Sequence, residues 1–254
     1  MKLVLTAFFM AWGMFWIVPC PVKWWDEKAR IGMLLFLPLF GAFIGGAWAL
    51  AVWVLLRYSH AEYPGTFSSA ILTIIPFVLS GFIHLDGYMD CADAVLSRRD
   101  LETRRKILKD SHVGSFAVIA LVSLFLLQYG AIYGQRIFYQ NVLLLPLVCA
   151  APRAYATAAV LHFPTLPGSS YKKMFSDGVP ARAKTASIVI LTALLVLPPL
   201  IFPRGGLCTV AGVLGAMITI MYLRHDLGGM SGDISGAGIT VGELCALAYL
   251  VFVR

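Results

Sequence analysis

Three aspartates, Asp86, Asp90 and Asp93, follow one another at spacings of four and three residues directly after an apolar run. If this segment is helical, these spacings place the three carboxylates on one face, within reach of a common point. Like charges this close repel each other, and a bound cation relieves the repulsion. Carboxylates beside phosphorylated ligands commonly share Mg²⁺ or Mn²⁺. The single nearby histidine, His84, argues against zinc. The spacing therefore predicts a site for a divalent metal, Mg²⁺ or Mn²⁺, that serves a phosphorylated substrate.

A structural interpretation of the same segment is open as well. The aspartates could cap helices and pair with the basic residues that follow, and Asp110 with Ser111 precedes an apolar run as an N-cap pair would. The basic residues either bind phosphate or only obey the charge rule of membrane topology. They are Arg104, Arg105, Lys106 and Lys109.

A second polar constellation is the glycine-rich segment 227–238, which surrounds Ser231 and Asp233. Glycine allows close backbone approach, so a loop of this kind can present amide N–H groups to a phosphate. A flexible connection explains the glycines nearly as well but does not explain Asp233. We therefore expect Asp233 to supply a further metal ligand.

A third candidate is Arg153, which follows Pro152 inside an apolar stretch. An arginine there needs a partner, either a substrate phosphate or an acidic residue. The chain has no nucleophile elbow, Walker A loop, Rossmann fingerprint or HExxH motif. Clustered aspartates, basic residues and a glycine-rich segment beside a membrane instead indicate metal-assisted phosphoryl transfer.

The elements that position these residues are long apolar segments. The 254 residues are 59% hydrophobic and 13% charged, whereas soluble domains have about 25% charged residues. The net charge of +7 is spread over short stretches between apolar segments, which argues against a nucleic-acid surface. We expect an all-α, polytopic membrane protein with six to eight transmembrane helices in a single domain, 1–254. The apolar segments run roughly over 3–19, 31–56, 66–83, 113–134, 140–162, 185–202, 207–223 and 239–253.

The basic residues alternate between connections, as the positive-inside rule describes. They cluster before the second, fourth and sixth apolar segments, while the intervening connections hold only Arg57, Arg136 and Arg204. The connections at about 84–112, 163–184 and 224–240 should therefore share the cytoplasmic face. These three connections hold nearly all of the unusual polar residues, including an Asp-rich segment at 81–116.

Together these segments resemble the cobalamin synthase family, the adenosylcobinamide-GDP ribazoletransferases. The resemblance rests on HLDGYMDCAD, RRKILKDSHVGSF and GGMSGD, with LPLFGAFIGG in the second apolar segment. It implies a multi-pass enzyme of the cell inner membrane with a Mg²⁺ cofactor and an active site facing the cytoplasm. Such an enzyme joins adenosylcobinamide-GDP to α-ribazole, or to α-ribazole 5′-phosphate, and releases GMP.

The resemblance also implies roles for individual residues. The three clustered aspartates hold Mg²⁺ on the diphosphate, and Asp233 completes the site. Lys109 or a nearby arginine balances charge, and His84 or Asp110 accepts the proton of the incoming hydroxyl. The residues expected to contact the substrates are Arg104, Arg105, Ser111, Arg153 and Gly232. The chain departs from the family at Cys91 and Ala94, and its first segment lacks the family's arginine.

Two other function classes fit part of the pattern. A CDP-alcohol phosphotransferase also uses membrane aspartates and metal, but its DG-AR pattern with two later aspartates is missing. A transporter could use the aspartates as an intramembrane cation site. The position of the aspartates at the end of an apolar run, beside many basic groups, favours phosphate handling. The sequence leaves the oligomeric state open.

Overall fold

The computed structural model describes residues 2–59, 65–135, 139–167, 178–203 and 205–252. The described residues form helices and no strand; one isolated bridge joins Thr165 to Met230. The all-α expectation is therefore confirmed. The α-helices are α1 (Lys2–Phe15), α2 (Arg30–Leu35), α3 (Leu37–Ser59), α4 (Thr66–Leu79), α5 (Ile83–Leu96), α6 (Leu101–Ile107), α7 (Ser115–Ile132), α9 (Leu145–His162), α11 (Ala181–Ile201), α12 (Cys208–Leu227) and α13 (Gly232–Phe252), with 3₁₀ turns η1 (Glu27–Ala29), η2 (Val142–Leu144) and η3 (Gly205–Leu207).

Six helical segments among the described residues are long and apolar enough to cross a membrane. They run over Leu37–Tyr58, Ser115–Ile132, Val142–His162, Ala181–Ile201, Gly205–Leu227 and Gly232–Phe252. A seventh span results if α4 and α5 count as one broken segment. The chain is thus a multi-pass membrane protein, and its six or seven candidate spans among the described residues agree with the expected six to eight.

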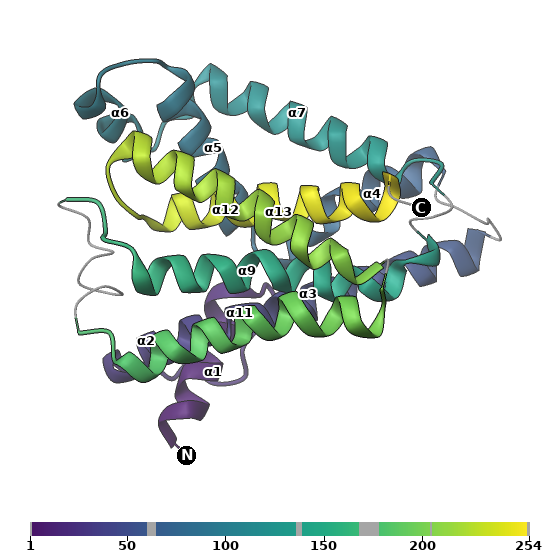
Figure 1. The fold of residues 1–254 in the computed structure, drawn as a ribbon. Coiled ribbons are helices and arrows are strands. Elements are labelled where there is room, and N and C mark those ends of the chain that lie inside the picture. Colours follow the sequence, from purple (N-terminus) through teal and green to yellow (C-terminus); the bar gives the residue numbers. More distant parts are fainter. Residues whose placement is uncertain (1, 60–64, 136–138, 168–177, 204, 253–254) are drawn as a thin grey trace.

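The long helices lie side by side in one bundle (Figure 1), and the candidate spans that contain α9 and α13 are the most buried of the six. Glycines allow α3 and α9 to approach closely. A Cβ on Gly41 would lie 2.6 Å from the carbonyl oxygen of Cys149, and a Cβ on Gly45 would lie 2.2 Å from the carbonyl oxygen of Leu145. Both glycines are on α3 and both carbonyls are on α9. Small residues at helix interfaces allow this approach in membranes, where van der Waals packing drives association.

A sharp turn separates α4 from α5. The expected third segment, 66–83, does not continue as one helix, because α4 ends at Leu79 and α5 leaves at 95° to it. Two consecutive residues in the left-handed region make the turn, Gly81 with φ 63° and Phe82 with φ 60°. Glycine adopts this conformation without strain and phenylalanine does not. The turn points the aspartate helix away from the direction of α4.

The glycine-rich segment is mostly helical, which corrects the expectation of a loop over 227–238. Only Gly228 to Ser231 connect α12 to α13, and α13 begins at Gly232. The Ser231 hydroxyl accepts a hydrogen bond from the Ile234 amide at 3.2 Å, as an N-cap does. The last expected segment, 239–253, therefore starts seven residues earlier and is long enough to span.

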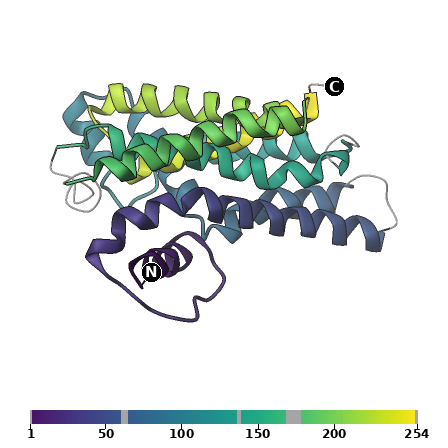
Figure 2. The ribbon, with the colours of Figure 1, turned by 60° about the horizontal axis from the view of Figure 1, so that its bottom comes forward.

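The first apolar segment forms α1, which is only 14 residues long. At about 1.5 Å per residue this length falls short of a hydrocarbon core about 30 Å thick. The helix runs across the long helices rather than alongside them, at the edge of the bundle (Figures 1 and 2). It packs against α2 and does not itself qualify as a span.

The connections expected at 84–112, 163–184 and 224–240 meet, in their described parts, at one end of the bundle (Figure 1). Arg104 of α6 forms an ion pair with Asp226 at the end of α12. Thr165, after α9, forms the bridge to Met230, with the Leu166 amide donating to the Met230 carbonyl at 3.0 Å. The expectation that these connections share one face is confirmed, whereas the side of the membrane that this face meets stays a prediction.

Candidate active site

The aspartate segment is helical, as the spacing required, and its carboxylates share one face of α5. With 3.6 residues per turn, Asp90 and Asp93 lie within about 40° of Asp86 around the helix axis. The opposite faces of α5 are packed into the protein through its buried residues. These are His84, Leu85, Gly87, Cys91 and Ala94. In contrast, Asp86 is exposed, and Asp90 and Asp93 are half-buried, so the acidic face borders solvent-accessible space.

The first turn of α13 lies directly against α5 and adds a fourth carboxylate. A Cβ on Gly87 would lie 2.7 Å from the Asp233 Cα and 2.8 Å from its carbonyl oxygen. Only glycine at position 87 permits this approach. Two turns further along α13, the Thr240 hydroxyl donates to the His84 carbonyl at 3.2 Å and fixes the register of the two helices. The expected convergence of Asp233 with the α5 aspartates is therefore present in the structure.

The four carboxylates form a strongly negative cluster. Asp90 is repelled by the charges of Asp86, Asp233 and Asp93, and Asp233 is also repelled by Asp86. Among the described residues, no lysine or arginine forms an ion pair with any of these four side chains. The structural interpretation, in which the basic residues after α5 neutralise the aspartates, has no such contact to support it.

The connection between α6 and α7 returns to the aspartate helix at Gly114. A Cβ at this position would lie 2.0 and 2.2 Å from the two carboxylate oxygens of Asp93. The Asp93 side chain thus occupies the space that any larger residue would fill. This contact brings the segment 109–114, with its polar residues, next to the acidic face.

A cavity of about 670 Å³ opens beside Asp86. Its walls come from the end of α1 and the following residues, including Met14 and Trp16, and from the α4–α5 turn. The Ile17 amide donates to the Leu79 carbonyl at 2.9 Å and ties these two walls together. The cavity thus places apolar side chains such as Trp16 and Ile17 beside one carboxylate of the acidic cluster.

The carboxylates are near one another but are not arranged as a complete metal cage. Within the part of the chain that the structure describes, no three histidine, cysteine, aspartate or glutamate side chains are placed to hold one ion. Mg²⁺ is usually bound through one or two carboxylates together with substrate phosphates and water. A set of hard oxygen donors without a neutralising cation fits such an ion, with the remaining ligands supplied by a phosphorylated substrate.

The two candidate proton acceptors occupy different environments. His84 lies two residues before Asp86, about 200° away around α5, and is buried with its ring stacked on Phe15 at 6.2 Å. The structure therefore does not bring His84 to the acidic face. Asp110 is exposed and accepts a bond from His112 Nδ1 at 2.6 Å. This bond lowers the pKa of Asp110 and raises that of His112, which makes Asp110 a weaker proton acceptor while the pair persists.

The basic residues of α6 divide into two groups. Arg104 pairs with Asp226, and Arg105 Nε donates to the Leu227 carbonyl at 2.8 Å, so both hold α6 against the end of α12. Lys109 and Ser111 are exposed and lie in the connection that returns to Asp93. Lys109 is thus the basic side chain of this segment that remains available to a ligand, since the described residues offer it no ion pair.

The remaining candidates are Arg153 and Gly232. Arg153 is 1% exposed in the middle of α9 and forms an ion pair with Glu243 of α13. Its Nη1 also donates to the Cys149 carbonyl at 2.7 Å. Of the two partners expected for an intramembrane arginine, the structure provides the acidic one. Gly232 is exposed as the first residue of α13, beside Asp233.

Sequence reasoning missed the close approaches that assemble the site. Gly87 and Gly114 act only by lacking a side chain, and Met14 and Trp16 come from a segment to which no role was assigned. A signal for Gly87 was present, because glycine inside a helix costs about 1 kcal/mol relative to alanine. A glycine directly after Asp86 in a helix therefore indicates that another backbone approaches there.

Comparison with known proteins connects this arrangement to one family. A family model described as cobalamin-5-phosphate synthase matches residues 7–251. The chain is 32% identical to the adenosylcobinamide-GDP ribazoletransferase of Clostridium botulinum (strain Alaska E43 / Type E3), over 97% of both chains. It is 31% identical to the protein of that name from Clostridium perfringens (strain 13 / Type A), over 98% of this chain and 99% of the relative. The protein of that name from Acinetobacter baumannii is 30% identical over 94% of each chain. No solved structure matches the chain.

Proposed function

The chain belongs to the cobalamin-5-phosphate synthase family, and on this premise we propose that it joins adenosylcobinamide-GDP to α-ribazole. The support is a match over nearly the whole length, together with curated relatives that are named for this transfer. The acceptor is α-ribazole or its 5′-phosphate. The observation that underlies the proposal in the structure is the convergence of Asp233 with the three aspartates of α5.

The proposed reaction is a phosphoryl transfer to an alcohol. The ribazole hydroxyl oxygen attacks the phosphorus that carries the corrinoid, and the bond from that phosphorus to the bridging oxygen breaks. GMP leaves with the bridging oxygen and the electron pair, while the hydroxyl proton passes to a base. The product is a phosphodiester, which is cobalamin or its 5′-phosphate depending on the acceptor.

The acidic cluster is the proposed binding site for Mg²⁺ and the diphosphate. When bound, Mg²⁺ neutralises charge that develops on the phosphoryl oxygens and on the leaving group. Asp86 and Asp90 are well placed to hold it because both border accessible space and repel each other. Asp93 and Asp233 flank them and are held in position by the glycine contacts at 114 and 87.

Other residues act on the substrates directly or through the shape of the site. We assign Lys109 to balance negative charge on the diphosphate, since it is exposed on the segment that abuts Asp93. Arg104 and Arg105 position this segment through their contacts with the end of α12. Asp110 is the proposed proton acceptor, because His84 is buried on the far side of α5.

We further propose that the end of the bundle with the site faces the cytoplasm across the cell inner membrane. The support is the positive-inside rule applied to the three connections that meet at this end. Single cysteines introduced into the connection at 97–100 should react with an impermeant maleimide only after the membrane is opened. Labelling of intact cells from outside would refute this orientation.

The test of the activity is GMP release by the purified full-length protein in lipid nanodiscs. We expect adenosylcobinamide-GDP, α-ribazole and Mg²⁺ to yield GMP and a cobalamin in equal amounts. Chelation should stop the reaction, and added Mg²⁺ or Mn²⁺ should restore it. Asp86→Asn and Asp90→Asn should each lower kcat by about a hundredfold or more, while Asp100→Asn, on an exposed helix cap, should not. Saturated enzyme without GMP release would refute the proposal.

A further inference from the structure

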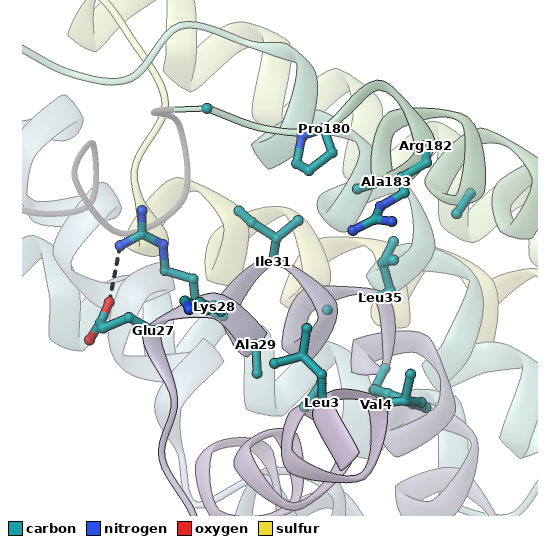
Figure 3. A pocket seen from close by; sticks show the side chains of 16 residues that line it. Leu3, Val4, Glu27, Lys28, Ala29, Ile31, Leu35, Pro180, Arg182 and Ala183 are labelled. Atoms are coloured by element: carbon teal, nitrogen blue, oxygen red, sulfur yellow. Dashed lines mark hydrogen bonds and ion pairs between the residues drawn. The ribbon is translucent and has the colours of Figure 1, made fainter. Parts of the chain in front are cut away.

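A second cavity lies between α1, η1, α2 and the start of α11 (Figure 3). Its volume is about 630 Å³. The floor is apolar, with Leu3 and Val4 of α1 facing Ile31 and Leu35 of α2 (Figure 3). None of the aspartates of the proposed active site lines it. The proposed transferase reaction therefore leaves this cavity without a role.

The rim of the cavity is basic. Lys28, Arg30 and Arg182 line it, and Arg30 forms an ion pair with Glu27 at 3.0 Å, the dashed line in Figure 3. Among the described residues, no carboxylate pairs with Lys28 or Arg182. Figure 3 shows the Arg182 guanidinium directed into the space between α11 and α2. The third cation, Arg30, is neutralised by Glu27, which also lines the cavity. Lys28 and Arg182 thus border an apolar pocket without an ion-pair partner among the described residues.

The cavity lies where the lipid-facing surface begins. It is bordered by the first two turns of α11, the candidate span whose window is only 11% buried within the protein. Along α11, exposed Ile188 and Val189 continue the apolar surface away from the cavity. Trp24 and Trp25, in the connection that leads to η1, are 45% and 57% exposed. Tryptophan at such positions is typical of the membrane–water interface.

We propose that this cavity binds one anionic glycerophospholipid of the surrounding bilayer. The phosphate diester lies between Lys28 and Arg182, and an acyl chain lies on the floor and passes onto the exposed face of α11. An apolar floor under basic side chains at the level of the headgroups matches both parts of such a lipid. A zwitterionic lipid lacks the net negative charge that two unpaired cations favour.

The test is lipid retention by the full-length protein in detergent, measured by native mass spectrometry without substrates. Phosphatidylglycerol and phosphatidylcholine of equal chain length are titrated in parallel. We expect one phosphatidylglycerol to bind in preference to phosphatidylcholine. Lys28→Gln and Arg182→Gln should each weaken its binding about fivefold, as expected for one basic charge near a lipid surface.

The matched controls are Lys184→Gln and Lys23→Gln, which remove the same charge from the same helix end and the same connection. Neither residue lines the cavity, and Lys184 lies about 200° around α11 from Arg182. Both controls should retain phosphatidylglycerol like the unmodified protein. Both test residues are exposed, so the helical circular dichroism and elution volume of all variants should be unchanged.

Three results would overturn the proposal. The first is equal binding of the two lipids, and the second is an equal loss in the control variants. The third is complete displacement of the lipid by excess inorganic phosphate or by α-ribazole 5′-phosphate, which would mark the cavity as a site for a soluble phosphate. The measurement uses no turnover, so its failure leaves the proposed transferase function untouched, and failure of the GMP assay leaves the lipid site untouched.

Discussion

Replacement of Gly87 by alanine should move Asp233 of α13 away from the three aspartates of α5. The added Cβ would lie 2.7 Å from the Asp233 Cα, whereas ordinary contact begins at 3.4 Å. The atoms that it meets are backbone, so no side chain can rotate away, and α13 must withdraw from α5 by about 0.7 Å. Overpacking of this kind costs about 1–3 kcal/mol of stability. A misplacement near 1 Å can reduce catalysis about a hundredfold.

We therefore expect Gly87→Ala to insert and fold, with a lowered unfolding temperature and a kcat reduced about tenfold to a hundredfold. The assay is GMP release in nanodiscs at saturating Mg²⁺ and substrates. The matched control is Gly130→Ala on α7, where an added Cβ meets nothing within 4 Å. This control should keep full activity and equal or greater stability, because alanine favours helix. Full activity of Gly87→Ala would refute the claim that the α5–α13 contact assembles the site.

Three further outcomes follow from individual contacts. In Gly114→Ala the added Cβ pushes on the Asp93 carboxylate, which can move, rather than on backbone atoms. GMP release should therefore fall while the unfolding temperature stays unchanged. A fall in both activity and unfolding temperature would instead indicate that Gly114 serves packing. Removal of one partner of the buried Arg153–Glu243 pair should lower the free energy of unfolding, measured with denaturant, by about 3–5 kcal/mol. Replacement of both residues by apolar ones should lower it less. A double replacement that costs as much as the two single replacements together would contradict this expectation. His112, whose pKa is raised by its aspartate partner, should titrate by NMR above the ordinary histidine range. The ion pair of His112 with Asp110 should be present below that pKa and be lost as the pH rises through it. If the pKa of His112 stays raised after Asp110 is replaced, the aspartate is not the cause.

The membrane spans were largely predictable because each is an apolar run of the length that hydrocarbon requires. The expected ends of the spans at 134, 162 and 202 lie within two residues of the ends observed for α7, α9 and α11. The break at Gly81 and Phe82 was not predictable in the same way. Hydropathy does not distinguish a straight helix from two helices at 95°, since the apolar composition of both is the same.

In the glycine-rich segment, the sequence predicts a loop where the structure has a helix. Isolated from its surroundings, glycine disfavours helix, so segment 227–238 was expected to be a loop. In the structure, Gly236 and Gly238 lie where a Cβ would meet the His84 backbone at 3.0 Å and the Ile220 side chain at 2.4 Å. Packing against α5 and α12 stabilises this helix, and the lack of side chains allows the packing. Local propensity could not reveal that interaction.

The sequence alone determined the common face of Asp86, Asp90 and Asp93, because helical periodicity is a local property and repulsion among carboxylates follows from their spacing. It also determined the need of Arg153 for a partner. Only the tertiary structure decided that Asp233 joins the aspartates through Gly87 and that Glu243 is the partner of Arg153. These outcomes depend on which helices lie side by side, and contacts between residues 90 or more positions apart leave no periodic trace along the chain.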